Sequence, residues 1–408
     1  MKILPFKGIL FDRTKVDEKD VITLPYDKIL VDQKRLYQER SPYNMVHLVL
    51  AESHGQAARL FRRWRDTGIL KEDPAPAIYV YEQEYEYPRG INNIRRAFIA
   101  LLELQPFNKD RVMPHERTFS KVVDDRMNLL ANCGANLEQI FVLGDGIGVD
   151  HWPPEKMIID FRDEFGIRHK LWPVTDPRKI SDLQRRVHKS RLFIADGHHR
   201  YTAALNYKET QKKKKGDVYT GNEEFNYRMT AFVDLQSNGL TILPTHRVVK
   251  NAEGLTDTVL LAQLKKYFTV TKTESMNKEK SHTIGMYLGA GKYYDLILKD
   301  DISMEQVLGV SRPRAWLYLD VNILHLLILK HIIGIDTHNA REEDKVAYIR
   351  EEEETKKMVD KKDARMAFIL NPTPIEQVKE IVSLAEVMPQ KSTDFYPKMH
   401  SGLVMRVL

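Results

Sequence analysis

The residues best suited to chemistry lie between Ile194 and Leu205, in the stretch Ile-Ala-Asp-Gly-His-His-Arg-Tyr-Thr-Ala-Ala-Leu. An apolar run stops at Asp196 and Gly197, and apolar residues then return at the three-and-four spacing of an amphipathic helix. This pattern predicts a strand that turns sharply into a helix. A glycine lets backbone N–H groups approach a ligand closely, and a helix N-terminus carries partial positive charge. The turn is therefore a candidate phosphate-binding site.

The side chains around this turn supply hydrogen-bond donors and proton-transfer groups. His198, His199 and Arg200 follow the glycine directly, and an arginine suits bidentate binding of phosphate. Asp196 is a candidate for holding Mg²⁺ or orienting a histidine, and Thr202 is a further candidate for binding the cofactor. The structural alternative is that Asp196 caps the helix, the histidines lie on the surface and Arg200 pairs with a local carboxylate.

A second polar motif, Pro114 to Thr118, lies between an expected strand and an expected helix. Thr118 is the expected N-cap of that helix, which leaves Glu116 on a loop between two regular elements. His115 and Arg117 are further candidate ligands of substrate or phosphate. The structural alternative for Glu116 is an ion pair with a neighbouring arginine.

Two later segments contain further candidates for an anion site. His246 and Arg247 follow Pro244-Thr245 at the expected end of a strand, where they complete an anion site or serve only the local structure. The segment 388–398 is polar and rich in proline, and we expect an ordered loop that folds back over a site. Lys391 and Lys398 in this loop are candidates for closing over a phosphate.

Strands and helices alternate along the whole chain, which predicts an α/β or α+β fold with mixed sheets. The expected division is a phosphate-binding lobe over 1–250 and a C-terminal α/β lobe over 251–408. Further expected elements are a strand over 21–27, helices over 56–67 and 119–131, strands over 77–87, 96–104 and 139–143, and hairpins over 226–243 and 283–298.

Composition excludes several classes of protein. The 408 residues are 42% hydrophobic and carry a net charge of +6, which mildly favours anionic ligands without resembling a dedicated nucleic-acid binder. Cys133 is the only cysteine, which excludes intrachain disulfides and CxxC redox pairs. No sufficiently long apolar stretch or signal-peptide pattern is found, so we expect a cytoplasmic protein. Neither GxxxxGK[ST] nor GxGxxG follows a strand, which argues against a P-loop enzyme or a Rossmann dehydrogenase.

Seven motifs in order resemble those of the bacterial and archaeal domain of unknown function 1015 family, over nearly the full length. These motifs are Leu24-Pro25-Tyr26-Asp27, Ser41-Pro42-Tyr43-Asn44, Tyr79-Val80-Tyr81-Glu82-Gln83, Pro114-His115-Glu116-Arg117-Thr118, Ala195-Asp196-Gly197-His198-His199-Arg200-Tyr201, Leu243-Pro244-Thr245-His246-Arg247 and Met388-Pro389-Gln390-Lys391-Ser392-Thr393. Two of them also resemble motifs of the wider ParB and sulfiredoxin-like superfamily, which includes free-serine kinases.

The wider resemblance implies a ParB/sulfiredoxin-like core with large insertions and assigns roles to particular residues. Glu116 matches the catalytic glutamate of the free-serine kinases, and Gly197 to Arg200 match their phosphate-binding turn. Sulfiredoxins carry a reactive cysteine in this turn, whereas this chain has His198 and His199, so reductase chemistry is not supported.

We therefore expect a nucleotide-dependent kinase of a small hydroxylated metabolite such as serine, using ATP or ADP with Mg²⁺. The expected catalytic residues are Glu116, His199 and Asp196. One alternative is a ParB-like regulator that binds nucleotide or DNA, although no convincing basic recognition helix is found. The other is a metal-dependent hydrolase using His198, His199 and His246 with Asp196, although no HExxH occurs. We expect no association with a membrane, and the sequence does not predict the oligomeric state.

Overall fold

The computed structural model describes residues 1–108, 110–114, 118–252, 254–277, 282–337, 345–384, 386–389 and 391–408. These residues divide into two compact units. The first unit comprises Met1–Thr241 and Pro397–Leu408, and the second comprises Ile242–Tyr396. This division differs from the expected one because the last twelve residues return to the first unit. There, strand β21 (Arg406–Val407) pairs with β7 (Ala135–Asn136).

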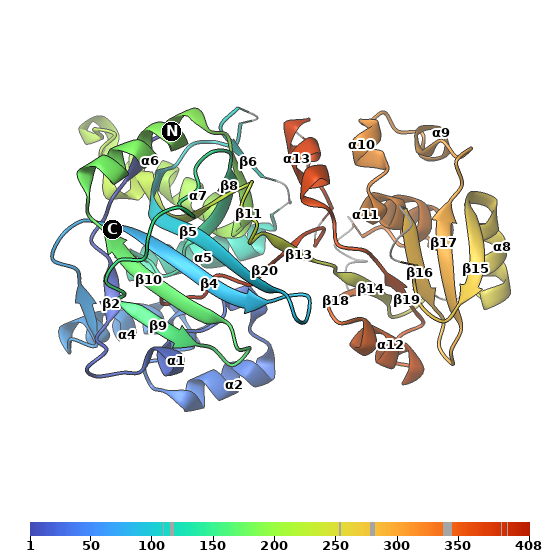
Figure 1. The fold of residues 1–408 in the computed structure, drawn as a ribbon, viewed down its shortest axis with the longest axis horizontal. Helices are drawn as coiled ribbons and strands as arrows, with labels where there is room; N and C mark the ends of the chain where they lie inside the picture. Colours follow the sequence, from blue (N-terminus) through green and yellow to red (C-terminus); the bar gives the residue numbers. More distant parts are fainter. Residues whose placement is uncertain are drawn as a thin grey trace. The chain divides into compact units, whose positions relative to one another are not determined.

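A large mixed sheet forms the centre of the first unit, in the order β6-β11-β8-β12-β5-β4-β10-β9, with β1 paired to β5. Its strands are β1 (Ile3–Leu4), β4 (Ile78–Glu86), β5 (Asn92–Glu103), β6 (Val112–Met113), β8 (Ile140–Gly144), β9 (Ile159–Arg162), β10 (Arg168–Val174), β11 (Leu192–Asp196) and β12 (Tyr227–Asp234). The pairs β6–β11 and β8–β12 are parallel and the others antiparallel. Figure 1 shows β5, β4 and β10 side by side. The predicted fold class is confirmed.

Helices and short strands complete the first unit. The helices are α1 (Glu18–Val21), η1 (Tyr26–Lys28), α2 (Val31–Arg40), α3 (Val46–Val49), α4 (His54–Asp66), α5 (Ser120–Cys133), α6 (Pro177–Lys189), α7 (His198–Lys215), η2 (Gly216–Val218) and η3 (Glu224–Asn226). The strands β2 (Ile9–Phe11) and β3 (Leu70–Glu72) form a separate pair. The core lies against the sheet, where the rings of Phe98 and Phe232 stack with centroids 4.7 Å apart. Burying such apolar surface is the main force that holds the sheet and its helices together.

The second unit contains a sheet in the order β15-β17-β16-β19-β14-β18. The strands of this sheet are β14 (His246–Val249), β15 (Phe268–Thr273), β16 (Thr283–Tyr287), β17 (Tyr293–Leu298), β18 (Val346–Ile349) and β19 (Met366–Ile369). Strands β13 (Thr241–Leu243, whose first residue belongs to the first unit) and β20 (Asp394–Tyr396) form a separate pair. The helices of the second unit are α8 (Asp257–Tyr267), α9 (Met304–Leu308), α10 (Arg314–Leu317), α11 (Asp320–Asn322), the π-helix η4 (Ile323–Ile333), α12 (Glu352–Asp360) and α13 (Ile375–Ser383). The predicted hairpin over 283–298 is confirmed as β16 and β17, with Gly289 in the turn at a φ of 84°.

Two expected elements are wrong. Residues 21–27 are not a strand, because α1 ends at Val21, η1 begins at Tyr26 and Thr23 between them makes only an isolated bridge to Ser401. Residues 226–243 are not a hairpin, because β12 pairs with β5 and β8 inside the large sheet. Gly239 does lie in a turn, and it packs so closely against the backbone at Ile94 that a Cβ atom would clash.

The helices of the described segments do not combine the length and apolar character that crossing a bilayer requires.

Candidate functional site

The predicted strand, turn and helix around Gly197 are confirmed. β11 ends at Asp196, Gly197 has a φ of 92°, and α7 begins at His198. A residue with a side chain rarely adopts this left-handed backbone. An ideal Cβ at position 197 would also lie 3.1 Å from Nη2 of Arg200, whose guanidinium packs against the glycine. The backbone conformation therefore favours glycine, a Cβ would crowd the Arg200 guanidinium, and this guanidinium lies beside the N-terminus of α7.

Asp196 lies between two cations. Its Oδ2 is 3.2 Å from Nζ of Lys398, and its Oδ1 is 3.5 Å from Nη2 of Arg200. Burial opposes ionisation, but the charges of Lys398, Arg200 and Lys28 outweigh it and hold the pKa of Asp196 well below its usual range. A Mg²⁺ ion at Oδ2 would displace Lys398. The described residues therefore fit a phosphate beside the turn better than they fit a metal ion on Asp196.

Lys398 is positioned by buried polar contacts along its own segment. The side-chain amide of Gln83 donates to the Lys398 carbonyl at 2.9 Å, and that of Gln139 donates to the His400 carbonyl at 2.9 Å. Arg95, fully buried, donates to the carbonyl of Pro397. These contacts tie the returning C-terminal segment to the large sheet, so the lysine amino group is held at Asp196 by the fold of the first unit.

A buried carboxylate anchors the same segment. Asp163 Oδ2 lies 3.0 Å from Nε2 of His169 and 3.3 Å from Nε2 of His400, and Tyr81 contacts the other ring nitrogen of His169 at 2.6 Å. Burial lowers the pKa of His169 to about 3, with the His400 charge acting in the same direction. The carboxylate and two imidazoles lie close enough together to ligate a metal ion, but direct contacts between them already link the segment to β10.

The two polar motifs leave the sheet at the same edge. β6 and β11 are parallel neighbours, with Leu192 opposite Val112 and Phe193 opposite Met113. The carboxyl ends of parallel neighbours point the same way, so both chains leave the same end of the sheet, with Met113 opposite Phe193 and thus three residues before Asp196. His115, Glu116 and Arg117 lie outside the described residues, and their predicted roles stay predictions.

A tertiary hydrogen bond joins the helices that follow the two motifs. The backbone N–H of Phe119 donates to Nε2 of His199 at 3.1 Å, and the two rings stack with centroids 6.0 Å apart. Phe119 is the N-cap of α5, so the expectation that Thr118 caps this helix is wrong. The N–H group is satisfied by a histidine from α7 instead of by a local side chain. Because Nε2 accepts this bond, the proton of a neutral His199 lies on Nδ1.

His198 and Thr202 lie in the first turns of α7. His198 is buried, with 4% of its surface exposed, and the Thr202 hydroxyl donates to the His198 carbonyl at 3.0 Å. Such a bond within the helix is an ordinary use of a threonine hydroxyl. The role of both residues in binding a cofactor stays a prediction.

The remaining candidates belong to the second unit. Arg247 is fully buried and donates from Nε to His325 at 3.1 Å and from Nη2 to the Lys391 carbonyl at 3.1 Å. His246 accepts the Leu370 N–H through Nδ1 at 3.2 Å. The structure thus links Arg247 with Lys391, and a phosphate-binding role for His246, Arg247 and Lys391 stays a prediction. The bonds accepted by His199 and His246 use nitrogen lone pairs that a metal would need, which argues against the metal-dependent hydrolase.

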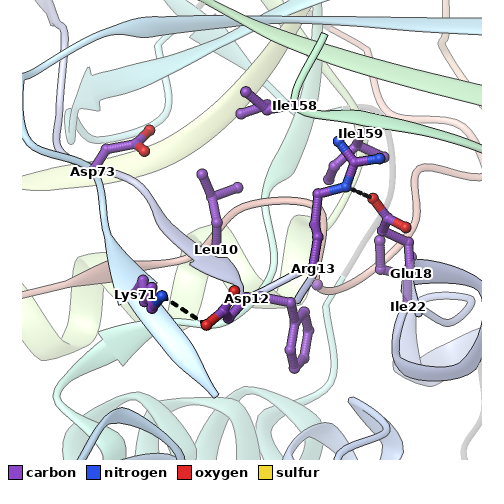
Figure 2. A pocket seen from close by; sticks show the side chains of 11 residues that line it. Leu10, Asp12, Arg13, Glu18, Ile22, Lys71, Asp73, Ile158 and Ile159 are labelled. Carbon is purple, nitrogen blue, oxygen red and sulfur yellow. Dashed lines mark ion pairs between the residues drawn. The ribbon is translucent and has the colours of Figure 1, made fainter. Parts of the chain in front are cut away.

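A separate pocket of about 280 Å³ in the first unit has a partly apolar lining and charged side chains. Figure 2 shows Asp12 paired with Lys71, at 2.7 Å, and Arg13 paired with Glu18. The Lys71 contact is the main cause that lowers the pKa of Asp12 to about 2. The lining of this pocket contains none of the predicted site residues. The charged side chains labelled in Figure 2 are largely paired with each other.

Comparison with known proteins identifies the family. The family described as "Protein of unknown function (DUF1015)" matches residues 3–322. The chain belongs to the DUF1015 family. No curated protein matches this sequence. The motifs at Pro114–Thr118 and at Ala195–Tyr201 thus both lie within the DUF1015 match, whereas Lys398 lies beyond it.

The solved structures to which this DUF1015 chain is similar are distant. One is a conserved hypothetical protein from Pyrococcus furiosus, with 14% identity and a TM-score of 0.37 over 76% of this chain and 95% of that one. Another is a free serine kinase in complex with AMP, with 14% identity and a TM-score of 0.36 over 73% and 86%. A third is C-terminally truncated SbnI from Staphylococcus aureus, with 12% identity and a TM-score of 0.35 over 74% and 85%.

Sequence reasoning missed several residues that surround the turn of this DUF1015 protein. Glu138 Oε1 accepts the N–H of Tyr26 at 3.2 Å and the hydroxyl of Ser401 at 2.6 Å. Arg200 donates from Nη1 to the carbonyl of Gln139 at 2.6 Å. The one available signal for Tyr26 was its place in the Leu-Pro-Tyr-Asp motif. Glu138 belongs to none of the sequence motifs, so only the order of the strands in the sheet shows that it lies near the turn.

Proposed function

We propose that this DUF1015 protein is a nucleotide-dependent phosphotransferase that transfers a phosphoryl group to a hydroxyl of a small metabolite. The observation that carries the proposal is the parallel pairing of β6 with β11, which starts the two polar motifs at one sheet edge. The bond from Phe119 to His199 supports it, because it ties the helices after the two motifs together. Phosphoryl transfer needs an acceptor base and phosphate-binding cations close together, and this arrangement can supply both.

The positive charges beside Gly197 would bind the phosphates of ATP or ADP. Lys398 and Arg200 lie within 3.2 and 3.5 Å of Asp196, and the N-terminus of α7 adds its partial positive charge. Asp196 acts as a positioning residue that holds both cations ready. One preorganised donor is worth about 3 kcal/mol of barrier in such sites, so two cations and a helix terminus could support useful catalysis.

Glu116 is the proposed base for the acceptor hydroxyl, and His199, with its proton on Nδ1, is the proposed proton donor. Mg²⁺ bound to the nucleotide would neutralise charge on the transferred group. We propose that it arrives with the nucleotide phosphates, because both oxygens of Asp196 already face cations. A free amino acid such as serine is the first acceptor to test.

The proposal is tested first by calorimetric titration with ATP, ADP and CTP in the presence of Mg²⁺. Lys398→Met should weaken nucleotide binding at least about tenfold, because a cation leaves the site. Lys213→Met is the matched control, since this exposed lysine lies in the last turn of α7. If no nucleotide binds to the wild-type protein, or if Lys398→Met binds as tightly as the control, the proposed site is wrong.

Transfer is then measured with the nucleotide that binds and a panel of hydroxylated metabolites. Glu116→Gln should abolish transfer and leave nucleotide affinity unchanged, because the amide keeps the size of the carboxylate and loses its basicity. Full turnover by this variant would remove Glu116 as the base. Nucleotide binding without transfer to any acceptor would favour the regulatory alternative over the kinase.

A further inference from the structure

A small cavity lies beside Arg200 in the first unit. It has a volume of about 20 Å³ and is lined by Arg126, Glu138, Arg200 and Arg228 together with apolar side chains. One water needs about 10–15 Å³, so the cavity has room for one group of about that size. A halide, or one oxygen of a carboxylate group, fits this volume.

The two central arginines leave donors unused. Arg200 and Arg228 expose only 7% and 5% of their surface. Arg228 donates from Nη2 to the Glu138 carbonyl at 2.9 Å, and Arg200 donates from Nη1 to the next carbonyl along the chain. The Nε–H groups of both arginines have no hydrogen-bond partner in the described parts of the chain. An unsatisfied buried donor costs free energy, and more so when it is charged.

The charges that line the cavity do not balance. Arg126, Arg200 and Arg228 face one carboxylate, that of Glu138. Arg126 is paired with Asp125, and Arg200 is near Asp196, whereas no ion pair of Arg228 is found among the described residues. Burial is the main cause that lowers the pKa of Arg228 to about 9, and the charge of Arg200 lowers it further. The charge of Glu138 offsets part of this lowering, but the lining still holds three guanidinium groups to one carboxylate.

We propose that this cavity is a binding site for a small monovalent anion, held there by the positive charges of Arg200 and Arg228. The ligand is a free halide or one carboxylate group, since both supply the same charge and acceptor atoms at this size. The cavity shares Arg200 with the proposed nucleotide site, but Arg126, Glu138 and Arg228 belong to the cavity alone and its test needs no nucleotide. Failure of the phosphotransferase proposal would therefore leave this one standing.

Binding is measured on the full-length protein without nucleotide, with bromide and formate as probes. Broadening of the bromide nuclear magnetic resonance line reports bound halide, and loss of the broadening on adding formate reports competition by a carboxylate. Melting temperatures in chloride and formate salts, compared with gluconate salt at equal ionic strength, give a second readout. We expect bromide broadening in the wild type, and formate or chloride should raise the melting temperature above that in gluconate.

Two variants that should change the anion affinity in opposite directions make the test specific. Arg228→Met should reduce anion affinity at least about tenfold, because it removes a charge and a donor from the cavity. Glu138→Gln should increase the affinity at least about tenfold, because it removes the negative charge that repels the anion. Its amide oxygen can still accept the bonds from Tyr26 and Ser401. Arg62→Met, at an exposed position on α4, is the control.

The relative strength of formate and bromide identifies the source of the anion. Tighter binding of formate indicates the carboxylate of a metabolite, and tighter binding of bromide indicates a free halide. The absence of anion-specific broadening in both the wild type and Glu138→Gln overturns the proposal. The proposal is also overturned if Glu138→Gln leaves the anion affinity unchanged. This variant is decisive even if Arg228→Met does not fold.

Discussion

The ion pair of Lys398 with Asp196 should stabilise the first unit measurably. The two side chains are only 9% and 18% exposed, and Nζ lies 3.2 Å from Oδ2. Removing one partner of a fully buried pair costs 3–5 kcal/mol, and a charged hydrogen bond contributes roughly 1.5–3 kcal/mol. Because Arg200 remains 3.5 Å from Asp196, we expect Lys398→Met to lower the free energy of unfolding by about 2 kcal/mol.

A double-mutant cycle isolates this pair from other effects of each substitution. Lys398→Met, Asp196→Asn and the double variant are unfolded in urea, and tryptophan fluorescence follows the transition. The signal reports mainly on the first unit, because Trp64, Trp152 and Trp172 lie in it. We expect a coupling free energy of about 2 kcal/mol. A coupling below about 0.5 kcal/mol would refute the claim that the fold holds the lysine at this carboxylate.

Three further perturbations test the fold around the site. Gly197→Ala should destabilise the protein by about 1–3 kcal/mol in urea unfolding, because the backbone φ is 92° and the new Cβ meets the Arg200 guanidinium. Equal stability would contradict this reading of the turn. The lowered pKa of His169, about 3, means that unfolded protein takes up a proton near pH 6.5 while folded protein does not. Stability from this group is complete above pH 6.5 and falls by up to about 1.4 kcal/mol per pH unit down to pH 3, whereas His169→Asn should show a shallower slope in urea unfolding at several pH values. Phe98→Ala should cost about 3–5 kcal/mol, because it removes the ring stacked on Phe232; a loss below about 1 kcal/mol would contradict the core packing.

The tyrosines of β4 show how far local pattern predicts structure. Alternation in Ala77 to Tyr87 predicts a strand, and β4 spans Ile78–Glu86 with Tyr79, Tyr81 and Tyr85 buried. Period two places alternate residues on one face, so this result needs only the geometry of a single strand. The pattern could not predict that Glu82 and Gln83 are also buried, because β5 and β10 on either side supply their surroundings.

The same limit explains the expectations that were wrong. Residues 226–243 read as a hairpin because Asn238-Gly239 is a strong local turn signal. The turn does form, with the Leu240 N–H donating to the Ser237 carbonyl, but β12 pairs with β5 and β8, where every one of its residues is buried. Thr118 is likewise a good local N-cap, but α5 begins one residue later and its N-cap, Phe119, donates its backbone N–H to His199. In both cases a partner distant in sequence replaces the local choice.

The sequence by itself determined the turn at Gly197, because an apolar run, a glycine and helical spacing are all local features. It also determined the family and the alternation of strands and helices. Only the tertiary structure decided which groups surround the turn. Lys398 reaches Asp196 from 202 residues away, and Glu138 and Arg228 meet Arg200 because β8 lies between β11 and β12. Local periodicity contains no information about strand order, since that order follows from how the whole chain buries its apolar surface.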